Sequence, residues 1–210
     1  SSLCFNSFLN NNIYVEGIKN IDKTDIDNAN KLGYKIKLLG FAEYLNNKFY
    51  QKVHPSLIKK DSYVASIDGV SNAVIIDGKP VGKSIIQGEG AGAAATTSAL
   101  ISDISSILRG NIKFPFSLSS KERKKIKFAN IEYRFFSAYL RFEVSDVPGV
   151  LSNITNIFSK NKVSIKRLVQ NPNKNKRTSS IIIITHKSRN SFLNKILKEV
   201  ARKKYIKQKP

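Results

Sequence analysis

The 210-residue sequence lacks the residues on which several classes of protein depend. It has one cysteine, Cys4, so no disulfide can form within the chain, and Cys4 with His54 and His186 cannot make a Cys/His zinc site. No apolar run approaches the ~20 residues of a membrane-spanning helix. The opening SSLCFNSFL has no basic segment of the kind that begins a secretory signal. These absences favour a soluble cytoplasmic protein with no metal and no membrane partner.

Methionine is absent as well, even at position 1, where Ser1 stands. A natural chain starts with methionine, and a chain of this length usually keeps a few more. We therefore expect the sequence to be a fragment whose start lies upstream of Ser1.

Acidic residues are scarce in the second half of the chain. Residues 1–110 carry 12 basic and 10 acidic side chains, whereas residues 111–210 carry 24 basic and 5 acidic ones, net charges of +2 and +19. Such asymmetry can mark a surface for nucleic acid or anionic lipid. It also arises from compositional drift, because lysine, isoleucine and asparagine, which AT-rich genomes favour, supply 74 of the 210 residues. We favour drift, because aromatic and basic residues are not interleaved as stacking on bases requires, and we expect no nucleic-acid partner.

Residue patterns divide the chain into two regions, joined by a basic linker over residues 111–137. In the first region a helix is expected from Thr24, whose hydroxyl can cap it, and Gly33 suits its end. A later helix is expected over residues 97–108. The Asp77–Gly78 pair predicts that the last two strands before that helix form a hairpin. The expected strands of this region cover residues 34–43, 49–54, 72–77 and 83–87.

The second region, residues 138–210, is predicted to have the order strand, helix, strand, strand, helix. This order is one strand short of the ferredoxin-like βαββαβ unit, and the last strand should follow Pro210. The fold class is therefore α/β (α+β), a mainly β region with helices followed by a small βαββα domain. The expected elements are strands 138–144, 163–169 and 180–185 and helices 150–160 and 191–200.

A glycine-rich stretch, GEGAG at residues 88–92, lies between a predicted strand and a predicted helix. Glycine lets the backbone pass close to a ligand, and the start of a helix presents free amides to anions. The spacing Gly88-x-Gly90-x-x-Ala93 even satisfies the dinucleotide-binding pattern, but no second strand–helix unit and no acidic residue follow at the required distance. A tightly packed strand–helix corner is the structural alternative.

A second turn, DVPGVL at residues 146–151, precedes the first helix of the second region. Proline and glycine suffice to explain a tight turn there, and amides at a helix start can also hold the carboxylate of a small amino acid. Catalytic residues are not evident: Cys4, His54 and His186 lack partners nearby in the sequence, and no two carboxylates are placed to divide acid and base roles.

Several stretches of the first region occur in an order and spacing that resemble one enzyme family. They are residues 16–39, VHPSLI at 53–58, ASIDGVSNAV at 65–74 and the glycine-rich stretch. Across residues 1–110 the chain resembles the C-terminal part of the catalytic and dimerisation region of homoserine dehydrogenase. Residues 138–204 resemble an ACT domain, with Asp146-x-Pro148-Gly149-Val150-Leu151 as its characteristic turn.

The resemblance implies an oxidoreductase that interconverts L-homoserine and L-aspartate 4-semialdehyde with NAD(P), on the route to threonine, methionine and isoleucine. In the family the catalytic lysine and its acidic partner precede the stretch that matches residues 1–8. The resemblance therefore implies that both lie upstream of Ser1, and no catalytic residue is assigned here. The glycine-rich turn approaches the nicotinamide end of the cofactor in the family. Gly92, with Gly90 and Ala91 beside it, is therefore the candidate cofactor contact.

The ACT resemblance implies regulation by an amino-acid effector, with threonine as the candidate. The family also implies a homodimer or homotetramer. The alternative is a non-catalytic amino-acid-binding regulatory protein derived from the enzyme, which predicts a genuine start codon near position 1. The candidate effector contacts are Asp146, Pro148, Gly149, Val150 and Leu151.

Overall fold

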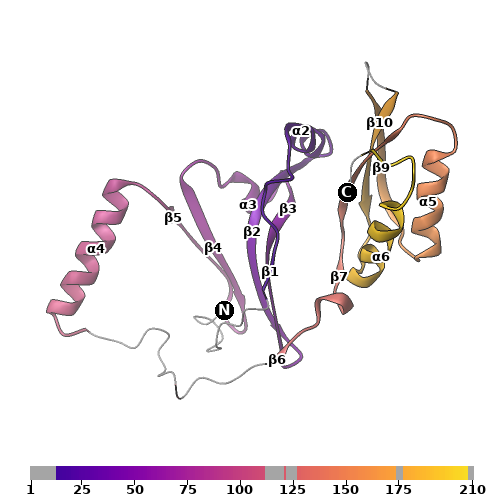
Figure 1. The fold of residues 1–210 in the computed structure, drawn as a ribbon. Helices are drawn as coiled ribbons and strands as arrows, with labels where there is room; N and C mark the ends of the chain where they lie inside the picture. Colours follow the sequence, from indigo (N-terminus) through magenta and orange to yellow (C-terminus); the bar gives the residue numbers. More distant parts are fainter. Residues whose placement is uncertain (1–12, 112–120, 122–126, 174–176, 208–210) are drawn as a thin grey trace. The chain divides into compact units, whose positions relative to one another are not determined.

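The computed structural model describes residues 13–111, 121, 127–173 and 177–207 (Figure 1). The chain separates into two compact units, residues 1–128 and 129–210, and each is described here by itself. Ser1, Cys4 and most of the basic linker lie outside the described residues.

The helix α2 (Lys23–Lys31) begins earlier than the sequence predicted. Its cap is Asp22 and not Thr24, so that expectation was wrong. The Asp22 carboxylate accepts a hydrogen bond from the Asp25 amide at 3.0 Å, and the Asp25 carboxylate accepts one from the Asp22 amide at 3.2 Å. This reciprocal capping box satisfies two amides at once, which a single threonine hydroxyl cannot do. Gly33 follows the helix at φ +84° and confirms the predicted end.

A long antiparallel hairpin dominates the first unit (Figure 1). β2 (Tyr34–Leu45) pairs with β3 (Lys48–Lys59) along twelve residues of each strand. Asn46 and Asn47 form the turn with positive φ, a conformation that asparagine tolerates and that suits two-residue hairpin loops. β3 continues past the predicted end at residue 54, and its other edge pairs in parallel with β1 (Tyr14–Val15) and β6 (Lys127–Phe128).

A short helix, α3 (Tyr63–Ser66), leads into a second hairpin of β4 (Ser71–Gly78) and β5 (Gly82–Glu89). This hairpin confirms the pairing predicted from the sequence. The helix α4 (Ala93–Leu108) follows, starting four residues before the predicted position 97, and none of its residues is buried within the described part of the chain. Its exposed apolar side chains are Leu100, Ile101, Ile104, Ile107 and Leu108.

The second unit confirms the predicted order of strands and helices. The sheet has the antiparallel order β8-β10-β9. Two short strands, β7 (Phe135–Phe136) and β11 (Ser188–Arg189), pair with each other and were not predicted. The principal elements are β8 (Tyr139–Ser145), α5 (Val150–Lys160), β9 (Ile165–Pro172), β10 (Thr178–Thr185) and α6 (Asn190–Val200), and a short 3₁₀ helix, Ile131–Tyr133, precedes β7.

Residues 205–207 lie along one edge of β8. Ile206 forms an antiparallel bridge with Val144, the Ser145 amide donates to the Tyr205 carbonyl at 2.9 Å, and the Lys207 amide donates to the Glu143 carbonyl at 2.8 Å. No strand is assigned to these residues, so the expectation that the last strand of the unit follows Pro210 stays a prediction.

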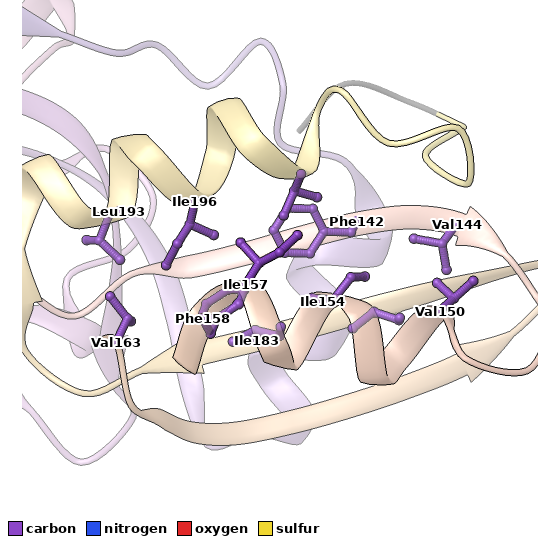
Figure 2. Packing of buried hydrophobic residues seen from close by; sticks show 12 residues of the cluster. Phe142, Val144, Val150, Ile154, Ile157, Phe158, Val163, Ile183, Leu193 and Ile196 are labelled. Atoms are coloured by element: carbon purple, nitrogen blue, oxygen red, sulfur yellow. The ribbon is translucent and has the colours of Figure 1, made fainter. Parts of the chain in front are cut away.

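The core of the second unit lies between α5, α6 and one face of the sheet (Figure 2). The rings of Phe142 on β8 and Phe158 on α5 meet edge to face, with centroids 6.5 Å apart. Ile182 and Ile184 are buried as well as Ile181 and Ile183, so both faces of β10 are covered, which accounts for its unbroken apolar run. No helix in the described ranges is long and apolar enough to span a membrane.

Candidate functional site

The glycine-rich turn, residues 88–92, joins the end of β5 to the start of α4. Gly92 caps α4 with φ +125° and ψ 147°, a backbone conformation that only glycine adopts without strain. The Thr96 amide donates to the Gly92 carbonyl at 3.0 Å, which closes the first turn of the helix. The amides before Thr96 have no acceptor within a helix, and the positive end of the α4 dipole lies at the turn.

Gly90 is glycine for a different reason, because another side chain occupies the space beside it. A Cβ atom built on Gly90 would lie 1.4 Å from Asn72 Nδ2 and 2.6 Å from Asn72 Cγ. The Gly90 amide donates to the Val70 carbonyl at 3.0 Å. All three residues singled out by sequence are exposed, and Gly90 is the one whose amide is hydrogen-bonded to another segment of the chain.

Two lysines of β2 hold the segment that precedes β4. Lys35 Nζ lies 2.7 Å from one carboxylate oxygen of Asp68, and Lys37 Nζ lies 2.5 Å from the other. The hydrogen bonds from both amines bring the pKa of Asp68 down to about 2. Sequence reasoning missed this group, because Asp68 lies more than 30 positions from both lysines and only the fold brings it to them.

The two histidines lie in different units and are described separately. His54 lies on β3, with Nδ1 2.7 Å from the Pro55 carbonyl oxygen, and burial lowers its pKa. Lys52, two residues before it, has its pKa lowered by burial to about 8. His186 is exposed. Among the described residues no group of three or more His, Cys, Asp or Glu could hold a metal ion.

The catalytic lysine and acid of the family have no assigned position in this chain. The sequence led us to expect both of them upstream of Ser1. Ser1 itself lies outside the described residues, which begin at residue 13. Their location upstream of Ser1 therefore stays a prediction.

The second unit contains a hollow of about 370 Å³ beside the turn that precedes α5. All five residues singled out in this turn line the hollow. Gly149 has φ +86°, and its carbonyl accepts the first helical hydrogen bond from the Asn153 amide at 2.9 Å. The complete lining comprises Val144, Ser145, Asp146, Val147, Pro148, Gly149, Val150, Leu151, Gln170 and Ile181.

The hollow combines an apolar wall with a polar rim. Val144 and Ile181 are buried strand residues. On the rim, Gln170 Nε2 donates to Asp146 Oδ1 at 3.2 Å, across 24 positions of sequence. Sequence reasoning missed Gln170 because only the β9–β10 pairing carries it to the turn. The first-turn amides of α5 can bind a carboxylate, and the wall can receive a short side chain.

Comparison with known proteins agrees with this two-part organisation. A family model described as homoserine dehydrogenase matches residues 1–105, and one described as ACT domain matches residues 138–202. The homoserine dehydrogenase of Helicobacter pylori is 35% identical over 188 residues, which cover 90% of this chain and 44% of the relative. That of Neisseria gonorrhoeae is 34% identical and is likewise covered over 44% of its length.

Solved structures show the same similarity. A homoserine dehydrogenase from Thiobacillus denitrificans superimposes with a TM-score of 0.85 at 29% identity, covering 99% of this chain and 48% of that chain. One from S. aureus, solved at pH 7.0, gives a TM-score of 0.60 at 27% identity. The chain thus spans less than half the length of these relatives. With its first half matched by the family model, the chain belongs to the homoserine dehydrogenase family of oxidoreductases and carries an ACT domain.

Proposed function

We propose that this chain is part of an NAD(P)-dependent homoserine dehydrogenase that interconverts L-homoserine and L-aspartate 4-semialdehyde. The observation that carries the proposal is the glycine-rich turn at the start of the 16-residue helix α4, within the region that matches the family. Because the chain covers only part of its relatives' length, the activity is proposed for the complete protein.

The turn has the properties that contact with a nicotinamide cofactor requires. Ala91 and Gly92 present backbone with almost no side chain, so a planar ring or amide can approach closely. The start of α4 adds amides and a partial positive charge for polar groups of the cofactor. NAD(P), when bound, supplies or accepts the hydride. The role of Ala91 and Gly92 is to orient the nicotinamide end of the cofactor. Gly90 contributes by holding the turn through Val70.

Steady-state kinetics of the complete protein test this proposal. With L-homoserine, reduction of NAD⁺ or NADP⁺ is followed by absorbance, and a wild-type protein inactive with both cofactors would contradict it. Gly92→Ala should raise the KM for the cofactor roughly tenfold, because the φ and ψ of Gly92 lie in a region that strains the backbone of alanine. Gly40→Ala on β2 is the matched control outside the turn, since its Cβ would meet nothing within 4 Å and its φ is not positive.

We further propose that the hollow of the second unit binds an amino-acid effector, with threonine as the candidate. The first-turn amides of α5 suit the α-carboxylate, Asp146 suits the ammonium group, and Gln170 can bind a hydroxyl. Inhibition would then require that threonine bind two states of the whole enzyme with different affinities. Calorimetric titration with L-threonine, and with D-threonine as the control, tests the site. Absence of binding by L-threonine would reject this effector.

We also propose an organisation for the whole chain, which the two family matches support. Residues 1–110 would form the C-terminal part of the catalytic and dimerisation domain, residues 111–137 a linker, and residues 138–210 the ACT domain. The boundary between the compact units, at residues 128 and 129, falls inside this linker and supports the division. A homodimer or homotetramer in the cytoplasm is proposed from the bacterial relatives. A complete protein that binds threonine and lacks dehydrogenase activity would instead support the regulatory alternative.

A further inference from the structure

The glycine-rich turn is fastened to a short stretch that we call the connecting segment, residues 63–72, which includes α3 and the start of β4. The β4–β5 pairing sets Ser71 and Asn72 opposite Glu89 and Gly88, and three further contacts hold the turn and the residue before it. The Tyr63 hydroxyl donates to Gln87 Oε1 at 2.5 Å, immediately before the turn, and the Val70 carbonyl accepts from the Gly90 amide at 3.0 Å. The Asn72 side chain occupies the space above Gly90. The position of the turn therefore depends on the position of the connecting segment.

The other side of the connecting segment is fastened to β2. Lys35 Nζ donates to the Ala65 carbonyl at 3.0 Å as well as to Asp68, and Lys37 Nζ donates to the Ile67 carbonyl as well as to Asp68. The two lysines are separated by one residue on a strand, so they lie on the same face of the hairpin. Each amine thus binds one carboxylate oxygen and one main-chain oxygen.

These bonds act together and not as isolated surface ion pairs. The side chains of Lys35 and Lys37 are 37% and 22% exposed, and that of Asp68 is 59% exposed. A single exposed pair of this kind contributes little. Here the Asp68 carboxylate accepts a hydrogen bond from each of the two amines. The same amines also donate to two backbone carbonyls, so the backbone from residue 65 to residue 68 is fixed. Bonds that involve a charged group are also stronger than neutral ones.

We propose that Asn72 and the group Lys35–Asp68–Lys37 are positioning residues for the glycine-rich turn, which they hold in a set place relative to the β2–β3 hairpin. Lys35 and Lys37 fix the connecting segment, and Val70 and Asn72 transmit this constraint to Gly90. Ala91 and Gly92 follow directly, so their backbone is held where it meets the nicotinamide end of the cofactor. This last step rests on the proposed function, whereas the mechanical link does not.

Hydrogen exchange of the turn amides in the complete protein tests the mechanical link. Asp68→Asn keeps the shape of the side chain and removes its charge, so exchange in a peptide covering residues 86–93 should become roughly threefold to tenfold faster, the factor for one weakened hydrogen bond. Asp77→Asn, the same change at the far end of the same hairpin, should leave this peptide unchanged. Equal exchange in wild type and Asp68→Asn would overturn the proposal.

A steric test of Asn72 is independent of charge. Gly90→Ala should force Asn72 out of its place and accelerate exchange of the turn, since no Cβ fits beside the amide group. The double variant Gly90→Ala/Asn72→Ala should exchange more slowly than Gly90→Ala, because the obstructing amide is gone. If removal of Asn72 has no effect on the Gly90→Ala variant, Asn72 does not hold the turn.

Kinetics of the complete enzyme separate this inference from the proposed function. Asp68→Asn should raise the KM for the nicotinamide cofactor severalfold and leave the KM for L-homoserine within twofold of wild type, and Asp68→Glu should restore part of the loss. A general loss of folding would instead lower the amount of active enzyme and leave both KM values unchanged. If the wild type has no dehydrogenase activity but the exchange results hold, the proposed function fails and the mechanical link stands.

Discussion

Replacement of Gly149 by alanine tests the turn that lines the effector hollow. Gly149 precedes α5 with φ +86° and ψ −15°, in the left-handed region. A Cβ atom there would meet nothing within 4 Å, so the substitution creates no clash. Any loss of stability must therefore come from the backbone conformation alone.

The size of the expected loss of stability follows from the left-handed conformation of Gly149. An L-residue other than glycine in the left-handed region costs about 1–2 kcal/mol. In a unit the size of residues 129–210 this lowers the melting temperature by about 5–10 °C. Gly149→Asn should lose less stability than Gly149→Ala, because asparagine tolerates the left-handed region better than alanine does.

Urea unfolding monitored by far-ultraviolet circular dichroism suits this protein, which has no tryptophan for fluorescence. Hydrogen exchange of α5 then assigns the change to the second unit. Gly17→Ala is the matched control, since Gly17 has no positive φ and no atom within 4 Å of its Cβ position. If Gly149→Ala proves as stable as wild type, residue 149 does not adopt the left-handed conformation and the geometry of the turn is wrong.

Three further predictions concern the core, an ion pair and the hollow. Ile154→Ala removes a fully buried side chain of α5 and should destabilise the second unit by about 2–5 kcal/mol in urea unfolding, whereas Ser152→Ala at an exposed position of the same helix should change it by less than about 0.5 kcal/mol. Because the folded-state pKa of Asp68 is about 2, below its ordinary value of 3.8, its stabilising effect should be complete above about pH 4 and disappear as the pH falls to about 2; a carboxyl resonance of Asp68 titrating near pH 4 would contradict this. Gln170→Ala should weaken L-threonine binding roughly threefold to tenfold in calorimetry, and Lys166→Ala, an exposed change on the same strand, should leave it unaltered.

The sequence patterns predicted the second unit more fully than the first. α5 was expected over residues 150–160 and lies there, because its apolar side chains recur at helical spacing and a proline–glycine turn precedes it. The run of four isoleucines predicted a buried strand, and β10 is buried along nearly its whole length, as expected of a strand that is covered on both faces. In the first unit the helix caps were misplaced, because Asp22 and Gly92 are recognisable as caps only when the backbone around them is known.

Local sequence thus determined the order of the principal strands and helices and the two glycine-containing turns, because hydrophobic spacing and turn residues act over a few positions. The tertiary structure alone decided which distant side chains meet those turns. Gln170 reaches Asp146 through the pairing of strands, and Asn72 reaches Gly90 through the register of the β4–β5 hairpin. Lys35 and Lys37 reach Asp68 only because the chain after the β2–β3 hairpin folds back onto β2. Such contacts depend on how separate elements pack, and no local pattern encodes that arrangement.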